Sequence, residues 1–158
     1  MDRMDIEDLL RSHPFARDFW PEHIKRLAGL ASPARFQPGE LIFHEGDHSS
    51  LFYLLLSGSV ALEFVDPGRP VRVSTLYSGE VLGWSSLTGD ESKQFQARAL
   101  QDVEALAIDG TRLRHACQED YAFGYAVMRS LAAVMAGRFH TMRAQLVDLY
   151  APVEVAVA

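Results

Sequence analysis

Two neighbouring segments, residues 79–87 and 93–109, hold the residues best suited to binding chemistry in this sequence. In the first, a short apolar strand ends in a tight turn at Gly83 that leads into a helical turn. Such a turn directs free backbone N–H groups toward one point, where an anion can accept hydrogen bonds. The side chains of the helical turn belong to Trp84, Ser85 and Ser86. The second segment begins with the cation Lys93, so the pair of segments predicts a site for a small anionic ligand.

Short strands must position these segments, because residues 36–109 alternate with a period of two between glycine and proline turn signals. The expected strands are Leu41–Phe43, Leu51–Leu56, Val60–Val65, Val71–Leu76 and Val103–Ile108. Several short strands at this spacing are typical of an all-β sandwich or barrel.

Helical patterns flank the strands on both sides, and the 158 residues fit one domain overall. Residues 1–35 have the apolar spacing of two short helices, and residues 110–150 predict a short helix followed by a long one from about Asp120. The long helix carries an apolar stripe at Met128, Leu131, Met135, Phe139, Met142, Leu146 and Leu149. A long helix with a narrow stripe often pairs with its own copy, so we expect a homodimer through the helix of residues 120–150.

Composition limits the classes of function that the chain can have. Hydrophobic residues make up 48% and charged residues 23%, which is an ordinary globular balance. The net charge of -6 argues against non-specific nucleic-acid binding, and no apolar run is long enough to predict a membrane span. Cys117 is the only cysteine, which excludes an intrachain disulfide and favours the reducing cytoplasm.

Three glycine-punctuated segments, taken in order, resemble the cyclic nucleotide-binding domain of the catabolite-activator and fumarate-nitrate-regulator type. They are residues 36–47, residues 52–60 and residues 99–109. The resemblance implies a β jelly roll (a double-stranded β-helix) flanked by short N-terminal helices and a long C-terminal helix, an α+β fold. It also implies that a ligand lies inside the roll, with its phosphate on a cassette at residues 79–100 and its base near the long helix.

The resemblance also bears on partners. In full-length regulators of this type, a DNA-binding helix-turn-helix follows the long helix. About eight residues follow Tyr150 here, so the expectation is a stand-alone domain without direct DNA binding. Its output would then pass to a protein partner.

The cassette departs from the family pattern at two positions. The family glutamate that accepts a hydrogen bond from the ribose falls on Trp84, whose indole has a donor but no acceptor. An alternative register gives that role to Gly79-Glu80. The family arginine that pairs with the phosphate falls on Lys93, which lacks the bidentate geometry of a guanidinium. Losing two charge-assisted contacts at roughly 1.5–3 kcal/mol each weakens binding by about two to four orders of magnitude. We therefore expect poor binding of cAMP and cGMP.

The candidate ligand-binding residues come from the cassette and from the long helix. They are Gly83, Trp84, Ser85, Ser86, Lys93, Gln94, Phe95, Met142 and Arg143. By the resemblance, Met142 and Arg143 lie where the long helix meets the base, and Arg143 could supply the cation that Lys93 supplies poorly. Structural roles stay open beside these: Gly83 and the serines can form a tight corner, Trp84 can pack in the core, and Lys93 can be a solvated loop charge.

Three functions remain open from the sequence. The first is a non-enzymatic regulatory domain that senses a cyclic nucleotide or another small anionic ligand. The second is a ligand-free dimeric interaction module whose cassette is filled by Trp84 and Phe95. The third is a cupin-like metalloenzyme, although His44 and His48 lack the spacing of two metal-binding histidines separated by one residue. No catalytic constellation is visible, and we expect neither catalytic residues nor a metal.

Overall fold

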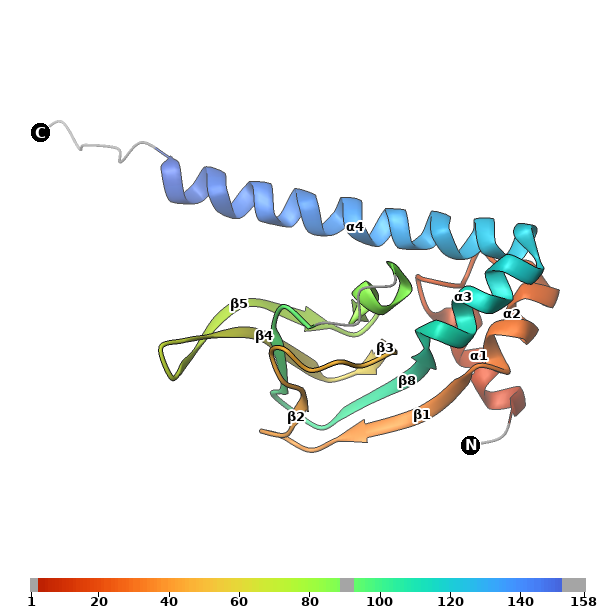
Figure 1. The fold of residues 1–158 in the computed structure, drawn as a ribbon, viewed down its shortest axis with the longest axis horizontal. Coiled ribbons are helices and arrows are strands. Elements are labelled where there is room, and N and C mark those ends of the chain that lie inside the picture. Colours follow the sequence, from red (N-terminus) through yellow and green to blue (C-terminus); the bar gives the residue numbers. More distant parts are fainter. Residues whose placement is uncertain (1–2, 89–92, 152–158) are drawn as a thin grey trace, which may run out of the picture.

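The computed structural model describes residues 3–88 and 93–151 of the chain. Part of the cassette segment, residues 89–92, and the tail from residue 152 lie outside the described residues. Within them, two four-stranded antiparallel sheets face each other as a jelly roll, with helices before and after it (Figure 1). The fold class expected from the sequence is confirmed.

The two sheets interleave strands from distant parts of the sequence. One has the order β1 (Ala31–Phe36), β8 (Val103–Asp109), β3 (Leu51–Ser57), β6 (Val81–Leu82). The other has the order β2 (Leu41–Phe43), β7 (Gln96–Ala99), β4 (Ser59–Asp66), β5 (Arg69–Tyr77). The five strands expected from alternation are all present as β2, β3, β4, β5 and β8, because each carries enough apolar residues to bury at least one face.

The central strand β3 is buried on both faces, which explains its nearly continuous apolar sequence. Phe52 and Leu54 belong to a cluster that packs the sheet against the helices. Tyr53 and Leu55, which alternate with them, belong to a second cluster inside the roll. The roll therefore has two apolar layers, and β3 contributes to both.

The N-terminal helical zone ends before residue 31 and does not extend to residue 35 as expected from the sequence. Residues 31–35 belong to strand β1 of the roll. Its sequence includes Ser32 and Pro33 and shows no clear apolar alternation. The strand forms at the sheet edge by antiparallel pairing with β8, from Ala31 opposite Ile108 to Phe36 opposite Val103. Proline is tolerated at such an edge, so tertiary pairing decides the conformation.

Four α-helices and one 3-10 turn complete the described chain. They are α1 (Arg3–Ser12), α2 (Pro21–Ala28), the 3-10 turn η1 (Trp84–Thr88), α3 (Gly110–Glu119) and α4 (Tyr121–Tyr150). Asp109 caps α3 by accepting from the main-chain N–H of Thr111 at 2.9 Å. Asp120 caps α4 in the same way, accepting from Ala122 at 3.1 Å. None of the described helices is both long and apolar enough to cross a membrane.

The long helix α4 runs across the molecule along the roll (Figure 1) and has two apolar faces. Phe123, Val127 and Leu131 are buried against the rest of the domain, so Leu131 does not belong to the exposed stripe expected from the sequence. The exposed apolar residues recur at alternating spacings of four and three, as in a coiled coil. They are Tyr121, Tyr125, Met128, Met135, Phe139, Met142, Leu146 and Leu149, with Ala132 in the same register.

Candidate functional site

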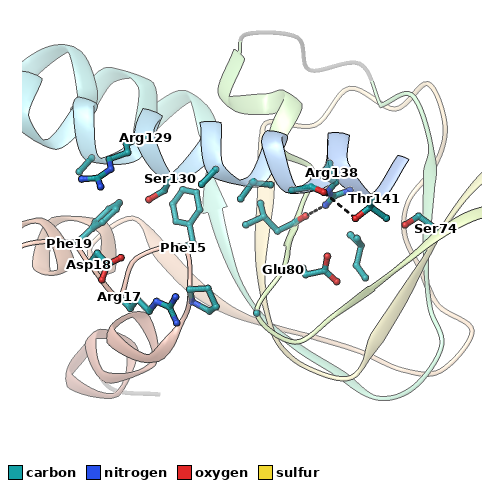
Figure 2. Close-up of a pocket in the computed structure, with 18 of the residues that line it drawn as sticks. Phe15, Arg17, Asp18, Phe19, Ser74, Glu80, Arg129, Ser130, Arg138 and Thr141 are labelled. Carbon is teal, nitrogen blue, oxygen red and sulfur yellow. Dashed lines mark hydrogen bonds between the residues drawn. The ribbon is translucent and has the colours of Figure 1, made fainter. Parts of the chain in front are cut away.

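A cavity of about 1160 Å³ lies between α4 and the rest of the domain. One end is formed by the segment that joins α1 to α2, including Phe15 and Phe19. The other end is formed by residues 73–76 of β5, and Phe95 is also part of the lining. Figure 2 shows this arrangement, with Phe15 and Phe19 at one end of the cavity and Ser74 and Thr141 at the other. The volume is sufficient for a nucleotide-sized ligand.

Arg138 projects from α4 into the middle of this cavity (Figure 2). Its guanidinium donates a hydrogen bond to the main-chain carbonyl oxygen of Val81, in the short strand that leads to the Gly83 turn. Burial lowers the pKa of Arg138, and the nearby Glu80 carboxylate partly offsets this effect. An arginine pKa is far above neutrality, so the side chain remains a cation.

Glu80 also lines the cavity, and its carboxylate is engaged by the turn between β5 and β6. Its Oε2 atom accepts a hydrogen bond from the main-chain N–H of Tyr77 at 2.7 Å. The turn is further closed by Gly79, whose N–H donates to the carbonyl oxygen of Leu55 at 2.9 Å. Glu80 therefore holds the turn in shape while it presents negative charge to the cavity.

His13 lies next to this turn and is 3% exposed. Its Nδ1 atom accepts a hydrogen bond from the main-chain N–H of Phe15 at 3.1 Å. Burial lowers the pKa of His13 from its usual value of 6.5, and the nearby main chain of Leu55 and Glu80 opposes this change. The imidazole is thus held in its neutral form between the N-terminal segment and the roll.

Lys93 is a buried cation and not a solvated loop charge, since only 3% of it is exposed. Its Nζ atom lies 3.4 Å from the carbonyl oxygen of Gly83 and 3.5 Å from that of Leu51. It also lies 5.3 Å from the centroid of the Phe43 ring, within the range of a cation–π contact. Lys93 is therefore directed beneath the Gly83 turn, and it is not among the residues that line the cavity.

The other candidate side chains fall into three groups. Ser86 is fully buried and donates from Oγ to the carbonyl oxygen of Gly83 at 3.0 Å, and Trp84 packs against the core cluster. Phe95 and Met142, which are distant in the sequence, line the cavity together. The rest of the set, Ser85, Gln94 and Arg143, is outside the lining; Gln94 and Arg143 are exposed, and Ser85 is half-buried.

Sequence reasoning missed Arg138 and the aromatic residues Phe15 and Phe19 as parts of this site. A signal for Arg138 was present, because Val127, Leu131, Val134 and Arg138 follow one helical face at spacings of four, three and four. A single cation that continues an apolar core-facing row indicates a buried charge. Phe15 and Phe19 gave no comparable signal, since their contribution depends on how the N-terminal segment packs beside α4.

Metal ligands do not gather in the part of the chain that the structure describes. No group of three or more His, Cys, Asp or Glu side chains there is arranged to hold a metal ion. His44 is exposed, and its Nδ1 lies 3.3 Å from Asp47 Oδ2 within a surface turn.

Comparison with known proteins gives concordant similarities. The family described as "Cyclic nucleotide-binding domain" matches residues 33–120. The "Cyclic AMP receptor protein" of Thermus thermophilus is 28% identical over 100 residues, which cover 63% of this chain and 46% of that protein. The "cAMP-dependent protein kinase regulatory subunit" of Hypocrea atroviridis is 27% identical over 106 residues, which cover 67% of this chain and 22% of that protein. The chain thus spans less than half the length of either relative.

Among solved structures, a putative cyclic nucleotide-binding protein from Geobacter metallireducens is 29% identical, with a TM-score of 0.76. The match covers 85% of this chain and 98% of the Geobacter chain. The similarity therefore extends over nearly the whole of a protein of comparable size.

Proposed function

Because the chain belongs to the cyclic nucleotide-binding domain family, we propose that it is a non-enzymatic regulatory domain that senses a small ligand between the roll and α4. The observation that carries this proposal is the cavity of about 1160 Å³, which has the roll on one side and α4 on the other. A ligand there contacts both the β scaffold and the helix. Occupancy can therefore change the position or the stability of α4, as two-state regulation requires.

In this proposal cAMP and cGMP bind only weakly, and the ligand that the domain senses is a different small molecule. Trp84 packs against the core, and Lys93 lies beneath the Gly83 turn outside the cavity lining. The two cassette positions that differ from the family pattern therefore offer the cavity neither an acceptor nor a cation. A cyclic nucleotide placed there would lack both charge-assisted contacts.

The domain acts as a homodimer in this proposal, and it passes its signal to a protein partner. Support comes from the exposed apolar row of α4, whose spacing suits a two-stranded coiled coil. We place the domain in the cytoplasm, in keeping with a sequence that has a single cysteine.

A variant that fills the cavity tests the proposal. Gly137 lines the cavity from α4, and a Cβ atom at this position would meet nothing within 4 Å. Gly137→Leu should therefore occupy the cavity without a clash, and helix propensity favours leucine over glycine. Ala136→Leu is the matched control, because Ala136 is exposed and does not line the cavity.

The measurement is calorimetric titration with cAMP and cGMP, together with mass spectrometry of small molecules released from the purified protein by denaturation. We expect a ligand that is bound by the wild type and by Ala136→Leu but lost from Gly137→Leu. Binding that persists in Gly137→Leu would place the ligand elsewhere and overturn the proposal. Dissociation constants for cAMP in the low micromolar range would contradict the expectation of weak binding.

A second candidate function is a ligand-free dimeric interaction module. It is favoured by the same exposed row on α4, which needs no ligand to pair. This reading predicts that Gly137→Leu leaves every interaction of the protein unchanged. The ligand-sensing proposal predicts that the same variant loses the ligand.

A further inference from the structure

We propose that Arg138 is the anion anchor of the cavity, and that an acidic group of the ligand binds its guanidinium in competition with the Val81 carbonyl oxygen. The inference rests on the proposed function, since it concerns the ligand of the same cavity. It assigns the cation to Arg138 in the middle of α4 and not to Arg143, which the sequence suggested and which lies further along the same helix. It also names the ligand class, an amphipathic molecule with one acidic group.

The first argument is the unused hydrogen-bonding capacity of Arg138. A guanidinium has five N–H donors, and burying it is costly unless it is paired. In the described chain, Arg138 donates to Val81, and no carboxylate lies within ion-pair distance of it. Arg138 is only part-buried, so its remaining donors face the solvent of the cavity, where an anionic ligand could bind them in a bidentate geometry.

The second argument is the charge of the cavity. Its charged lining residues, among those that the structure describes, are three arginines and two carboxylates. They are Arg17, Arg129, Arg138, Asp18 and Glu80. The lining is thus net positive in a chain whose formal charge is -6. Glu80 favours the charged form of Arg138, but its carboxylate is held by the Tyr77 N–H at 2.7 Å and forms no ion pair with the guanidinium.

The third argument is the apolar character of the walls on both sides of Arg138. Leu62, Val73 and Leu76 line the cavity on the roll side, and Phe15 and Phe19 line it on the other. A ligand that pairs with Arg138 would place its remaining surface against these side chains. Burial of a flat apolar group there would stabilise the complex. Inorganic anions would gain only the ionic contact.

The position of Arg138 also links binding to the conformation of the domain. The hydrogen bond to Val81 joins α4 to β6, two residues before the Gly83 turn. A ligand anion that takes over the guanidinium removes this bond between helix and strand. The empty and occupied cavities therefore differ in how α4 is attached to the roll.

A pair of fluorescent probes that differ in charge tests the anchor. The anionic probe is 8-anilinonaphthalene-1-sulfonate, and the neutral probe is N-phenyl-1-naphthylamine, which has nearly the same aromatic body. Arg138→Gln should weaken binding of the anionic probe at least about tenfold and change binding of the neutral probe less than about twofold. Arg112→Gln is the control, since Arg112 is an exposed residue on α3 that lies outside the cavity.

Each outcome decides one question. Equal loss of both probes, or no loss of the anionic probe, would overturn the anchor while leaving the cavity as a ligand site. Failure of the wild type to bind the anionic probe would overturn the anchor and the proposed function together. If Arg138→Gln does not fold, the Nε–H signal of Arg138 in a ¹H–¹⁵N spectrum, identified by its absence from Arg138→Lys, should move with the anionic probe alone. A signal that does not respond to that probe would also overturn the anchor.

Discussion

The Nζ atom of Lys93 lies 3.4 Å from the carbonyl oxygen of Gly83, so the cassette lysine binds the turn from beneath. The same ammonium approaches the Leu51 carbonyl oxygen and the face of Phe43. Its position thereby joins three segments of the roll. A lysine in this place stabilises the turn, where a solvated lysine would contribute little.

Lys93 should consequently resist acetylation in the native protein. The sequence has two lysines, and the other one, Lys25, is exposed on α2. With an excess of an N-hydroxysuccinimide ester, we expect Lys25 to react at least about tenfold faster than Lys93, because a buried amine reacts only after local opening. Peptide mass spectrometry at several reaction times gives both rates in one sample. Rates measured in urea, where both lysines are exposed, serve as the reference. If Lys93 and Lys25 react at equal rates in the native protein as well, Lys93 is accessible and the prediction is wrong.

Lowering the pH should destabilise the fold through His13. Burial lowers the pKa of His13 below its usual value of 6.5, so the unfolded chain takes up a proton that the folded chain excludes. The contribution of His13 to stability is therefore complete above the unfolded pKa and is lost as the pH falls below it, by at most about 1.4 kcal/mol per pH unit.

Urea titrations between about pH 7.5 and about pH 5.5 measure this dependence as the free energy of unfolding. His13→Gln cannot take up the proton, and its stability should change less over the same range. The same slope in the variant and the wild type would assign the pH dependence to other groups.

Much of the fold could be predicted from the sequence because its signals are local. The turns at Gly46, Gly58 and Gly79 have positive φ angles, which glycine adopts at little cost. The apolar alternation of β4 and the aspartate caps of α3 and α4 likewise depend only on residues close together in the sequence. Strand β1 was missed because its conformation depends on β8, a strand about seventy residues away.

The candidate site was less predictable, because tertiary packing decides which side chains reach the cavity. The resemblance placed Lys93 and Arg143 at the ligand, whereas the structure turns Lys93 beneath the Gly83 turn and leaves Arg143 exposed. Arg138 reaches the cavity because residues three and four apart lie on the same face of a helix. Its side chain therefore follows Leu131 and Val134 on the face that packs against the domain. Two of the candidates, Phe95 and Met142, line the cavity.

Alanine at Gly58 should destabilise the domain more than alanine at Gly68. Both glycines have positive φ, at 84° and 74°, so both substitutions strain the backbone by about 1–2 kcal/mol. A Cβ atom at Gly58 would also collide with the carbonyl oxygen of Asp102 and lie 3.0 Å from Val103 Cγ2, whereas one at Gly68 meets nothing within 4 Å. Overpacking adds about 1–3 kcal/mol to Gly58→Ala. Urea denaturation compares the two variants, and equal losses would rule out the steric contribution.

A charge on the exposed row of α4 should dissociate the proposed homodimer. Phe139 is 66% exposed in the single chain and lies at the middle of the row. Phe139→Glu would bury a carboxylate in the interface and raise the dimer dissociation constant at least about a hundredfold. Sedimentation equilibrium measures this constant. Ala144→Glu, an exposed position off the row, is the control and should remain dimeric. A wild type that sediments as a monomer would refute the dimer itself.

The start of α3 has a mechanical consequence. A Cβ atom at Gly110 would lie 2.9 Å from the carbonyl oxygens of Ser50 and Ser86, and the Gly110 N–H donates to Ser50 at 2.6 Å. Three backbone segments thus meet closely here, with the Ser86 hydroxyl oxygen also 2.9 Å from that Cβ position, so a residue larger than glycine does not fit. The hydrogen bond to Ser50 ties this junction to the segment before β3, so a displacement of the Ser50 backbone is passed directly to the first residue of α3.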